Sequence, residues 1–228
     1  MTNLPQFSGL GANIVAASAK ITMEEGFRAA TLRSVAKKAG VQLPQIYHHI
    51  GNMEQLADAT ASYLWIAFLE GREENPDSIP ALVDALETQI HFGLTYSELY
   101  LHISAPRKGA ASSFWDIQSE YLKERIKKVA KDGYLRVSES QATEYLFPFS
   151  AGMIITCLQR TSANTHVSWL ALQAVKPLLY REETPEMKES DRVRAHASAL
   201  KTYLGGNHEL TLGERALMWE LLNRIAST

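Results

Sequence analysis

Apolar side chains recur along almost the whole chain at spacings of three and four residues, the period of an α-helix. No segment shows the strict alternation that marks a half-buried strand. The sequence therefore predicts an all-α fold. The predicted helices cover residues 8–25, two short segments within 31–50, 52–71, 79–102 with a break at 93–97, 113–131, 138–160, 166–180, 191–204 and 211–225.

The two short helices within residues 31–50 are predicted to be joined by a tight turn at Gly40. Thr31 is a good N-cap for the first of them, and Gly40 can take the positive φ that ends a helix and turns the chain. Pro44 suits the first turn of the second helix, and Ile46 and Ile50 return that helix to the core. A helix, a tight turn and a second helix with polar exposed side chains form the geometry that reads a DNA major groove.

The charge distribution supports this interpretation. Residues 27–53 contain no Asp or Glu but include Arg28, Arg33, Lys37 and Lys38, whereas the whole chain has 23 Lys and Arg against 25 Asp and Glu. A local positive face on a nearly neutral chain suits a specific DNA-binding protein. A solvated surface helix would explain the charges alone, but it would not explain the helix-turn-helix spacing around them.

With these features, residues 26–56 resemble the N-terminal domain of TetR-family (TetR/AcrR) transcriptional repressors. In that family a first helix ends in Gly-Phe/Tyr, followed by T-x-x-x-(I/V)-A-x-x-A-G-V-x-x-x-x-(L/I)-Y-x-H-(F/I/V)-x-x-K-x-x-L. The chain matches from Gly26-Phe27 to Leu56 at nearly every fixed position, and the likeness with its flanking helices covers about residues 8–68. One departure is Met53, where the family often has a lysine that touches a DNA phosphate.

The resemblance implies a three-helix helix-turn-helix DNA-binding domain over residues 1–71 and a larger helical domain for ligand binding and dimerisation over residues 72–228. It also implies a homodimeric, ligand-responsive repressor on a palindromic operator. Positions near the start of the recognition helix are expected to reach base edges, and others to contact phosphates. The expected base contacts are Arg33, Gln42, Leu43, Pro44 and Gln45; the expected phosphate contacts are Thr31, Lys37, Tyr47, His49 and Asn52; His48 could do either.

Large side chains gather on the helices of the second domain. They could be ordinary core, or they could line a cavity for a small-molecule effector, as the resemblance implies. The candidate effector-binding residues are Phe92, Tyr96, Tyr100, Trp115, Tyr121, Phe149, Met153 and Trp169. The long apolar segment 138–160 and the C-terminal helices are candidates for the dimer interface, and the sequence does not decide between them.

No arrangement of residues indicates catalysis, a metal site or a cofactor. His48 and His49 are adjacent and would point about 100° apart on a helix, so they cannot share one metal. The single cysteine, Cys157, is expected to be a small buried residue. The sequence has no apolar run long enough for a membrane span and no signal core, so a cytoplasmic protein is expected. Two other classes remain open: a constitutive DNA-binding dimer without an effector, and an all-helical small-molecule carrier or enzyme.

Overall fold

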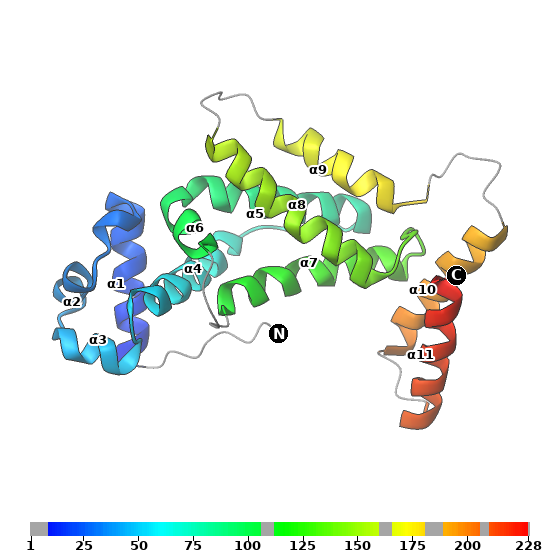
Figure 1. Cartoon of the computed structure of the whole chain (residues 1–228), viewed down its shortest axis with the longest axis horizontal. Coiled ribbons are helices and arrows are strands. Elements are labelled where there is room, and N and C mark those ends of the chain that lie inside the picture. The colour runs from blue at the N-terminus through cyan, green and yellow to red at the C-terminus, as the bar shows by residue number, and fades with distance from the viewer. Residues whose placement is uncertain (1–8, 106–111, 160–165, 181–188, 206–209, 228) are drawn as a thin grey trace. The chain divides into compact units, whose positions relative to one another are not determined.

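The computed structural model describes residues 9–105, 112–159, 166–180, 189–205 and 210–227. Apart from one isolated bridge between Leu135 and Leu179, all regular secondary structure in these ranges is helical, and the predicted all-α fold is confirmed. The helices are labelled in Figure 1. Their bounds are α1 Leu10–Glu25, the 3-10 turn η1 Phe27–Ala29, α2 Leu32–Ala39, α3 Leu43–His49, α4 Met53–Leu69, α5 Ser78–Thr95, α6 Ser97–Ser104, α7 Ser113–Lys131, α8 Glu139–Gln159, α9 Val167–Val175, the 3-10 turn η2 Lys176–Leu178, α10 Glu189–Gly205 and α11 Leu212–Ser227.

Glycines with positive φ end several of these helices. The backbone of Gly26 has φ 85° after α1, and that of Gly40 has φ 69° after α2. A side chain at either position would be strained, because residues with a Cβ adopt this region only at a cost. The sequence therefore sets where α1 and α2 end, and with them the direction of the following segment.

The described helices form two compact units, each built from several segments of the chain. Unit 1 comprises residues 1–73, 89–120 and 154–161, and unit 2 comprises residues 74–88, 121–153 and 162–228. Unit 1 therefore contains the predicted DNA-binding domain together with later segments from α5, α6, α7 and α8. The predicted domain boundary at residues 71–72 stays a prediction.

The core of unit 1 holds α1 to α4 together. Helix α1 packs against both α2 and α4. Fully buried side chains come from every one of the four helices, namely Ile14, Val35, Ile46, Leu56 and Leu64. The short helices α2 and α3 are thus fixed by tertiary packing, which a helix of this length needs because it is marginal in isolation.

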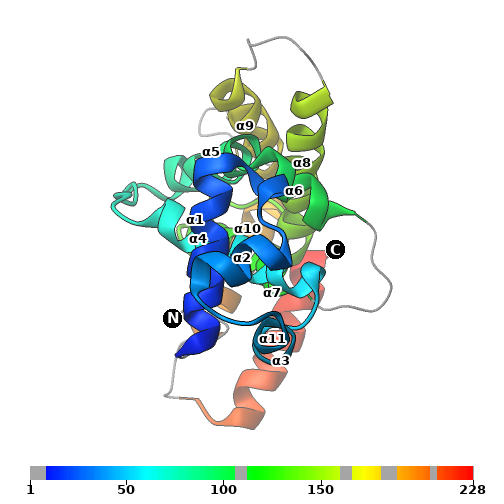
Figure 2. The ribbon, with the colours of Figure 1, turned by 90° about the vertical axis from the view of Figure 1, so that its left-hand side faces the viewer.

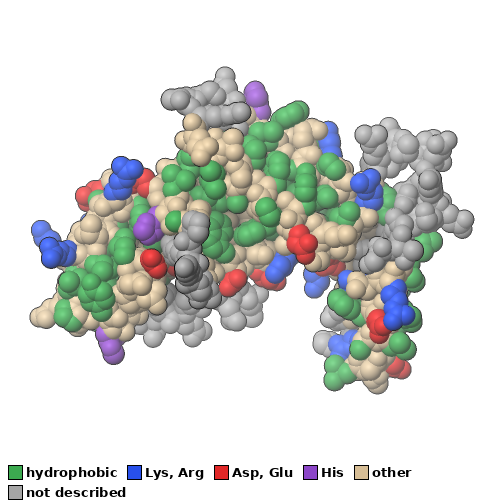
Figure 3. All heavy atoms as spheres, in the orientation of Figure 1, with side chains coloured by type: hydrophobic (Ala, Val, Ile, Leu, Met, Phe, Trp, Pro, Cys, Tyr) green, Lys and Arg blue, Asp and Glu red, His purple; other side chains and the backbone are tan. Residues whose placement is uncertain are grey.

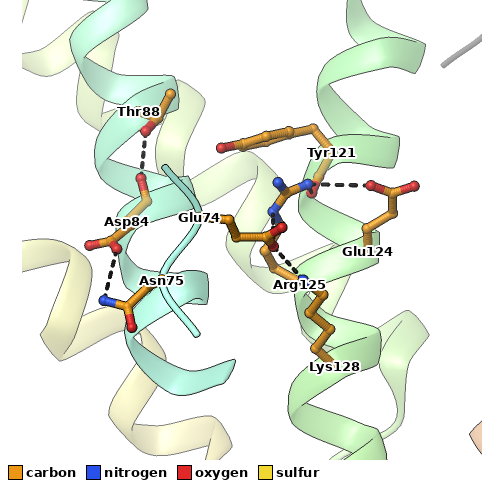
Figure 4. Close-up of polar contacts among 8 residues, drawn as sticks. All are labelled: Glu74, Asn75, Asp84, Thr88, Tyr121, Glu124, Arg125 and Lys128. Atoms are coloured by element: carbon orange, nitrogen blue, oxygen red, sulfur yellow. Dashed lines mark hydrogen bonds and ion pairs between the residues drawn. The ribbon is translucent and has the colours of Figure 1, made fainter. Parts of the chain in front are cut away.

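Unit 2 has a separate apolar core formed by α5, α7, α8 and α9. Leu86, Ile126, Leu146 and Val175 are among its fully buried members. At its edge the Glu74 carboxylate lies 2.5 Å from Nζ of Lys128 and 3.5 Å from Nε of Arg125, as Figure 4 shows. The hydrogen bond from Lys128 is the main cause that lowers the pKa of Glu74. These two ion pairs hold the polar segment before α5 against α7.

Candidate nucleic-acid interface

The turn between α2 and α3 is fixed by local hydrogen bonds. Thr31 caps α2, because its hydroxyl accepts a hydrogen bond from the Ser34 N–H at 3.1 Å. At the other end, the Val41 N–H donates to the Ala36 carbonyl at 3.0 Å, and the Asn13 side-chain amide donates to the Ala39 carbonyl at 3.0 Å. These bonds satisfy carbonyls that a helix end leaves unpaired, so the angle between α2 and α3 is well determined.

Helix α3 presents most of its side chains to solvent. Ile46 is fully buried and Ile50, just after the helix, is buried as well, so these two residues anchor α3 to unit 1. Leu43 is half-buried, and the exposed residues are Gln42, Pro44, Gln45, Tyr47, His48 and His49. Figure 2 shows α1, α2 and α3 turned toward the viewer. The exposed set has hydrogen-bonding side chains on a short protruding helix, as a major-groove reader requires.

Two of the expected DNA contacts also hold the local backbone. The Gln42 N–H donates to Oε1 of Gln45 at 2.8 Å, and the Asn52 N–H donates to Oε1 of Gln55 at 3.0 Å. In turn, Oδ1 of Asn52 accepts from the Gln55 N–H at 3.0 Å, which completes a capping box at the start of α4. Gln45 and Asn52 therefore each combine a capping oxygen with an amide NH₂ group that can donate to a ligand.

The four basic residues of the acid-free segment fall into two pairs. Arg28 lies 3.2 Å from the Glu98 carboxylate on α6, and Lys38 lies 3.0 Å from the Glu24 carboxylate on α1. The hydrogen bond from Lys38 lowers the pKa of Glu24, so this carboxylate remains charged at neutral pH. Arg33 and Lys37 are exposed and have no carboxylate partner among the described residues. Of the four, Arg33 and Lys37 are therefore the cations available to DNA, in line with the expected base contact of Arg33 and the expected phosphate contact of Lys37.

The neighbouring lysines of α2 should differ in their effect on DNA binding. We expect Lys37→Gln to make the log–log salt dependence of binding shallower by about 0.9 per half-site, because one phosphate contact and its counterion release are lost. Lys38→Gln should change the slope much less, since Glu24 already neutralises that charge. Binding isotherms of both variants over a salt series measure the difference. Equal slopes for the two variants would remove Lys37 from the phosphate contacts.

All eleven expected DNA contacts lie on α2, α3 or the residues that cap α2, α3 and α4. The structure thus gathers them within one small part of unit 1. Met53 is half-buried at the start of α4, and it borders a groove together with Thr31, Arg33 and Tyr47. Its proposed place next to a phosphate stays a prediction.

The candidate effector residues are divided between the two units. Phe92, Tyr96, Tyr100 and Trp115 belong to unit 1, where they join Trp65, Phe68 and Phe114 in one aromatic cluster with ring centroids 4.9–6.4 Å apart. Burial raises the pKa of Tyr100 and, less strongly, that of Tyr96. The other four candidates, Tyr121, Phe149, Met153 and Trp169, belong to unit 2.

Within unit 2, two of these candidates have surroundings that differ from a pocket lining. The Trp169 side chain is 60% exposed on α9. The ring of Tyr121 carries the Arg125 guanidinium 3.8 Å above its centroid, and Figure 4 shows both side chains. Cys157 is half-buried rather than buried as expected. An effector site at the eight candidates stays a prediction.

Two sets of contacts in unit 1, made by Asp58 and by Glu98, were not predicted from the sequence. Asp58 on α4 accepts hydrogen bonds from the hydroxyls of Ser112 and Ser113 and from the Ser113 N–H, so it holds the start of α7. Glu98 on α6 contacts both the side chain and the N–H of Arg28. Partners 54 to 70 residues apart leave no local signal, although an acidic residue within the mostly buried α4 could have suggested the first contact.

The comparisons with known proteins agree with this geometry in the region of the interface. Residues 14–60, which include α2 and α3, match the model of the family described as bacterial regulatory proteins, tetR family. The N-terminal domain belongs to the TetR family. The segment spans the helix-turn-helix and the start of α4, and the protein is accordingly a DNA-binding transcriptional regulator with an all-α fold.

Whole-chain comparisons add less. Among solved structures, apo ActR from Streptomyces coelicolor has a TM-score of 0.49 and 15% identity, over 96% of this chain and 85% of that one. A TetR transcriptional regulator from Agrobacterium tumefaciens has a TM-score of 0.46 and 18% identity, over 77% and 97% of the two chains. A HlyIIR mutant protein has a TM-score of 0.46 and 15% identity, over 77% and 98%. No curated protein matches, and the TM-scores below 0.5 carry no conclusion about function.

Two further observations concern the described residues only. None of their helices combines the length and the apolar character needed to cross a membrane. In the same part of the chain, no three His, Cys, Asp or Glu side chains are placed to hold a metal ion.

Proposed function

We propose that this TetR-like regulator is a repressor that binds a palindromic operator as a homodimer and leaves it when a small molecule binds elsewhere in the chain. The observation that carries the proposal is the exposed polar face of α3, set beside the unpaired cations Arg33 and Lys37. Two such faces in a symmetric dimer would enter successive major grooves about 34–36 Å apart or a multiple of that distance.

Release by a ligand requires a connection between the DNA-binding helices and the rest of unit 1. Two polar contacts supply candidates for it, Glu98 with Arg28 and Asp58 with Ser113. A movement of α6 or α7 would change these contacts and tilt the DNA-binding helices α2 and α3. The spacing of the two recognition helices in the dimer would then change. A ligand can drive this change only by its differential affinity for the two states, about 1–3 kcal/mol in typical systems.

The α10–α11 hairpin supports the proposal that the protein is a dimer. Among the described residues of the hairpin, the buried apolar side chains are Ala197, Leu204 and Leu222, and α10 and α11 pack chiefly against each other. Large apolar side chains remain exposed on it, namely Val193, Leu200, Tyr203, Leu212, Leu217, Trp219, Leu221 and Ile225. Exposed large apolar side chains in this number favour an interaction surface, and a symmetric partner would cover part of them with a second copy of the same hairpin.

If the hairpin pairs two chains, Leu217→Glu combined with Leu221→Glu should convert the dimer to a monomer. Four buried charges per dimer would oppose association, because a buried unpaired carboxylate is strongly unfavourable. Light scattering coupled to size-exclusion chromatography measures the mass. Met23→Glu, which charges an exposed apolar residue on α1, serves as the control and should remain dimeric. A dimeric double variant would place the interface on other helices.

The experiment that tests the function is selection of binding sites from a random DNA library at several salt concentrations. We expect a palindromic motif, with affinity falling steeply as salt rises. Extracts or metabolite pools added to the selected duplex then test for release. If no palindrome emerges at any salt concentration, the operator proposal is wrong.

A constitutive DNA-binding dimer is the second candidate, and one observation favours it. Four of the candidate effector residues belong to an aromatic cluster in which Phe92 and Tyr100 are almost completely buried against neighbouring rings. A cluster packed in this way is typical of a filled core. If no extract releases the protein from its selected duplex, this candidate replaces the ligand-responsive one.

A further inference from the structure

A groove lies beside the DNA-binding helices, within unit 1. Its volume is about 1070 Å³, which is ample for a small molecule. Its walls come from η1, α2, α3, the start of α4, α6 and the end of α8. Apolar side chains form much of the lining, chiefly Leu32, Leu43, Met53, Leu101 and Leu158. Figure 3 shows hydrophobic side chains gathered over the region of α2 and α3.

Part of the groove lining is an apolar side chain that is exposed to solvent. Leu101 on α6 borders the groove and is 48% exposed, although Tyr100 and Ile103 on the same helix are buried. Single exposed leucines are common, but this one borders a groove that is also lined by Leu43 and Met53. A ligand with an apolar body would remove this surface from water.

The charges of the lining indicate which polar group the ligand would carry. Arg28 and Glu98 lie in the groove and neutralise each other through their 3.2 Å contact. Arg33 also borders the groove and has no carboxylate partner among the described residues. The remaining uncompensated charge of these groups is therefore positive, and a guanidinium binds carboxylates and sulfonates through paired N–H donors.

We propose that this groove binds a compact organic anion, whose apolar body covers Leu101 and Met53 and whose single negative group lies on Arg33. Thr31, Arg33 and Tyr47 border the same groove and are proposed DNA contacts, so anion and DNA compete for them directly. The inference rests on that placement of DNA in the proposed function.

The mechanism differs measurably from release by a distant effector. A directly competing ligand raises the apparent Kd for DNA in proportion to its concentration, without limit. A ligand acting from a separate site reaches a plateau set by the coupling, about 5–150-fold in typical systems. The shape of the curve therefore distinguishes this groove from the proposed effector site.

The test uses the full chain, its selected duplex and 8-anilinonaphthalene-1-sulfonate, which joins an apolar aromatic body to one sulfonate. We expect its fluorescence on the protein to fall when duplex is added, and the apparent Kd for duplex to rise linearly with probe concentration. N-phenyl-1-naphthylamine, the same body without the sulfonate, should not displace DNA. A plateau, no displacement, or equal displacement by the neutral probe would overturn the proposal.

Variants locate the site. Leu101→Gln should weaken competition by the anionic probe at least tenfold and leave duplex affinity within twofold, because Leu101 is not among the proposed DNA contacts. Met23→Gln alters another exposed apolar residue of unit 1, outside the groove, and should leave competition unchanged. Thermal melts confirm that both variants are folded. Probe fluorescence without DNA reports on the groove even if no duplex is selected, and wild-type probe binding by Leu101→Gln would refute the site.

Discussion

Gly93→Ala is expected to destabilise unit 1 by about 1–3 kcal/mol, the usual cost of overpacking a well-packed core. A Cβ at this position in α5 would lie 2.6 Å from Cγ2 and 2.7 Å from Cδ1 of Ile154. Ile154 is fully buried, so it cannot move away without displacing its own neighbours. The clash outweighs the gain of about 1 kcal/mol that alanine brings over glycine in a helix interior.

Gly152→Ala is the matched control, because Gly152 also lies inside a helix but a Cβ there would meet nothing within 4 Å. It should leave stability unchanged or raise it by up to about 1 kcal/mol. Chemical denaturation of both variants measures the difference. In the double variant Gly93→Ala with Ile154→Ala, the first substitution should cost much less than alone, since the clashing side chain is gone. A Gly93→Ala variant as stable as wild type would show that α5 and α8 do not approach so closely.

Much of the fold could be predicted from local sequence. The hydrophobic period places every helix, and residues with a defined backbone role set many of the ends, as Thr31, Gly40 and Asn52 do around α2, α3 and α4. These signals depend only on residues close together in the chain, so they can be identified from a single sequence. The DNA-binding helices are predicted best because their caps, turn and buried positions all lie within about thirty residues.

Contacts between distant segments could not be predicted in this way. Gly93 was interpreted as a helix interruption, and the α5–α6 break does follow it, but its close approach to Ile154 depends on α8, 61 residues later. The basic segment lacks acids in sequence, yet Glu98 and Glu24 neutralise two of its four cations in space. Pairings of this kind depend on how helices pack, and a single sequence does not specify that packing.

The same limit applies to the candidate effector residues. Aromatic side chains on facing helices were expected to border one cavity, but an aromatic residue fills space as readily as it lines it. In the structure four candidates are part of the aromatic cluster of unit 1, and the groove beside α2 and α3 is bordered by other residues. Helical periodicity predicts which face of a helix is buried, but it does not predict whether the side chains on that face fill a core or line a cavity.

Gln45→Glu is expected to separate the two roles of Gln45, which are to cap the start of α3 and to contact a base. A glutamate can still accept the hydrogen bond that the Gln42 N–H donates to Oε1, and its charge is favourable in the first turn of α3. It cannot donate to adenine N7, whereas glutamine reads adenine by accepting from N6 and donating to N7. The variant should therefore melt at or above the wild-type temperature while losing affinity for the selected site.

The loss should be large because a symmetric dimer makes the contact twice. At about 1–3 kcal/mol for each base contact, the affinity for the selected operator should fall between about 30-fold and 10⁴-fold. Gln45→Ala also removes the N3 side chain that accepts from the Gln42 N–H, so it should lose stability in addition to affinity. Repeating the site selection with Gln45→Glu measures the base preference directly. If that variant selects the wild-type motif with undiminished affinity, Gln45 serves only as a cap, and base recognition belongs to the other exposed residues of α3.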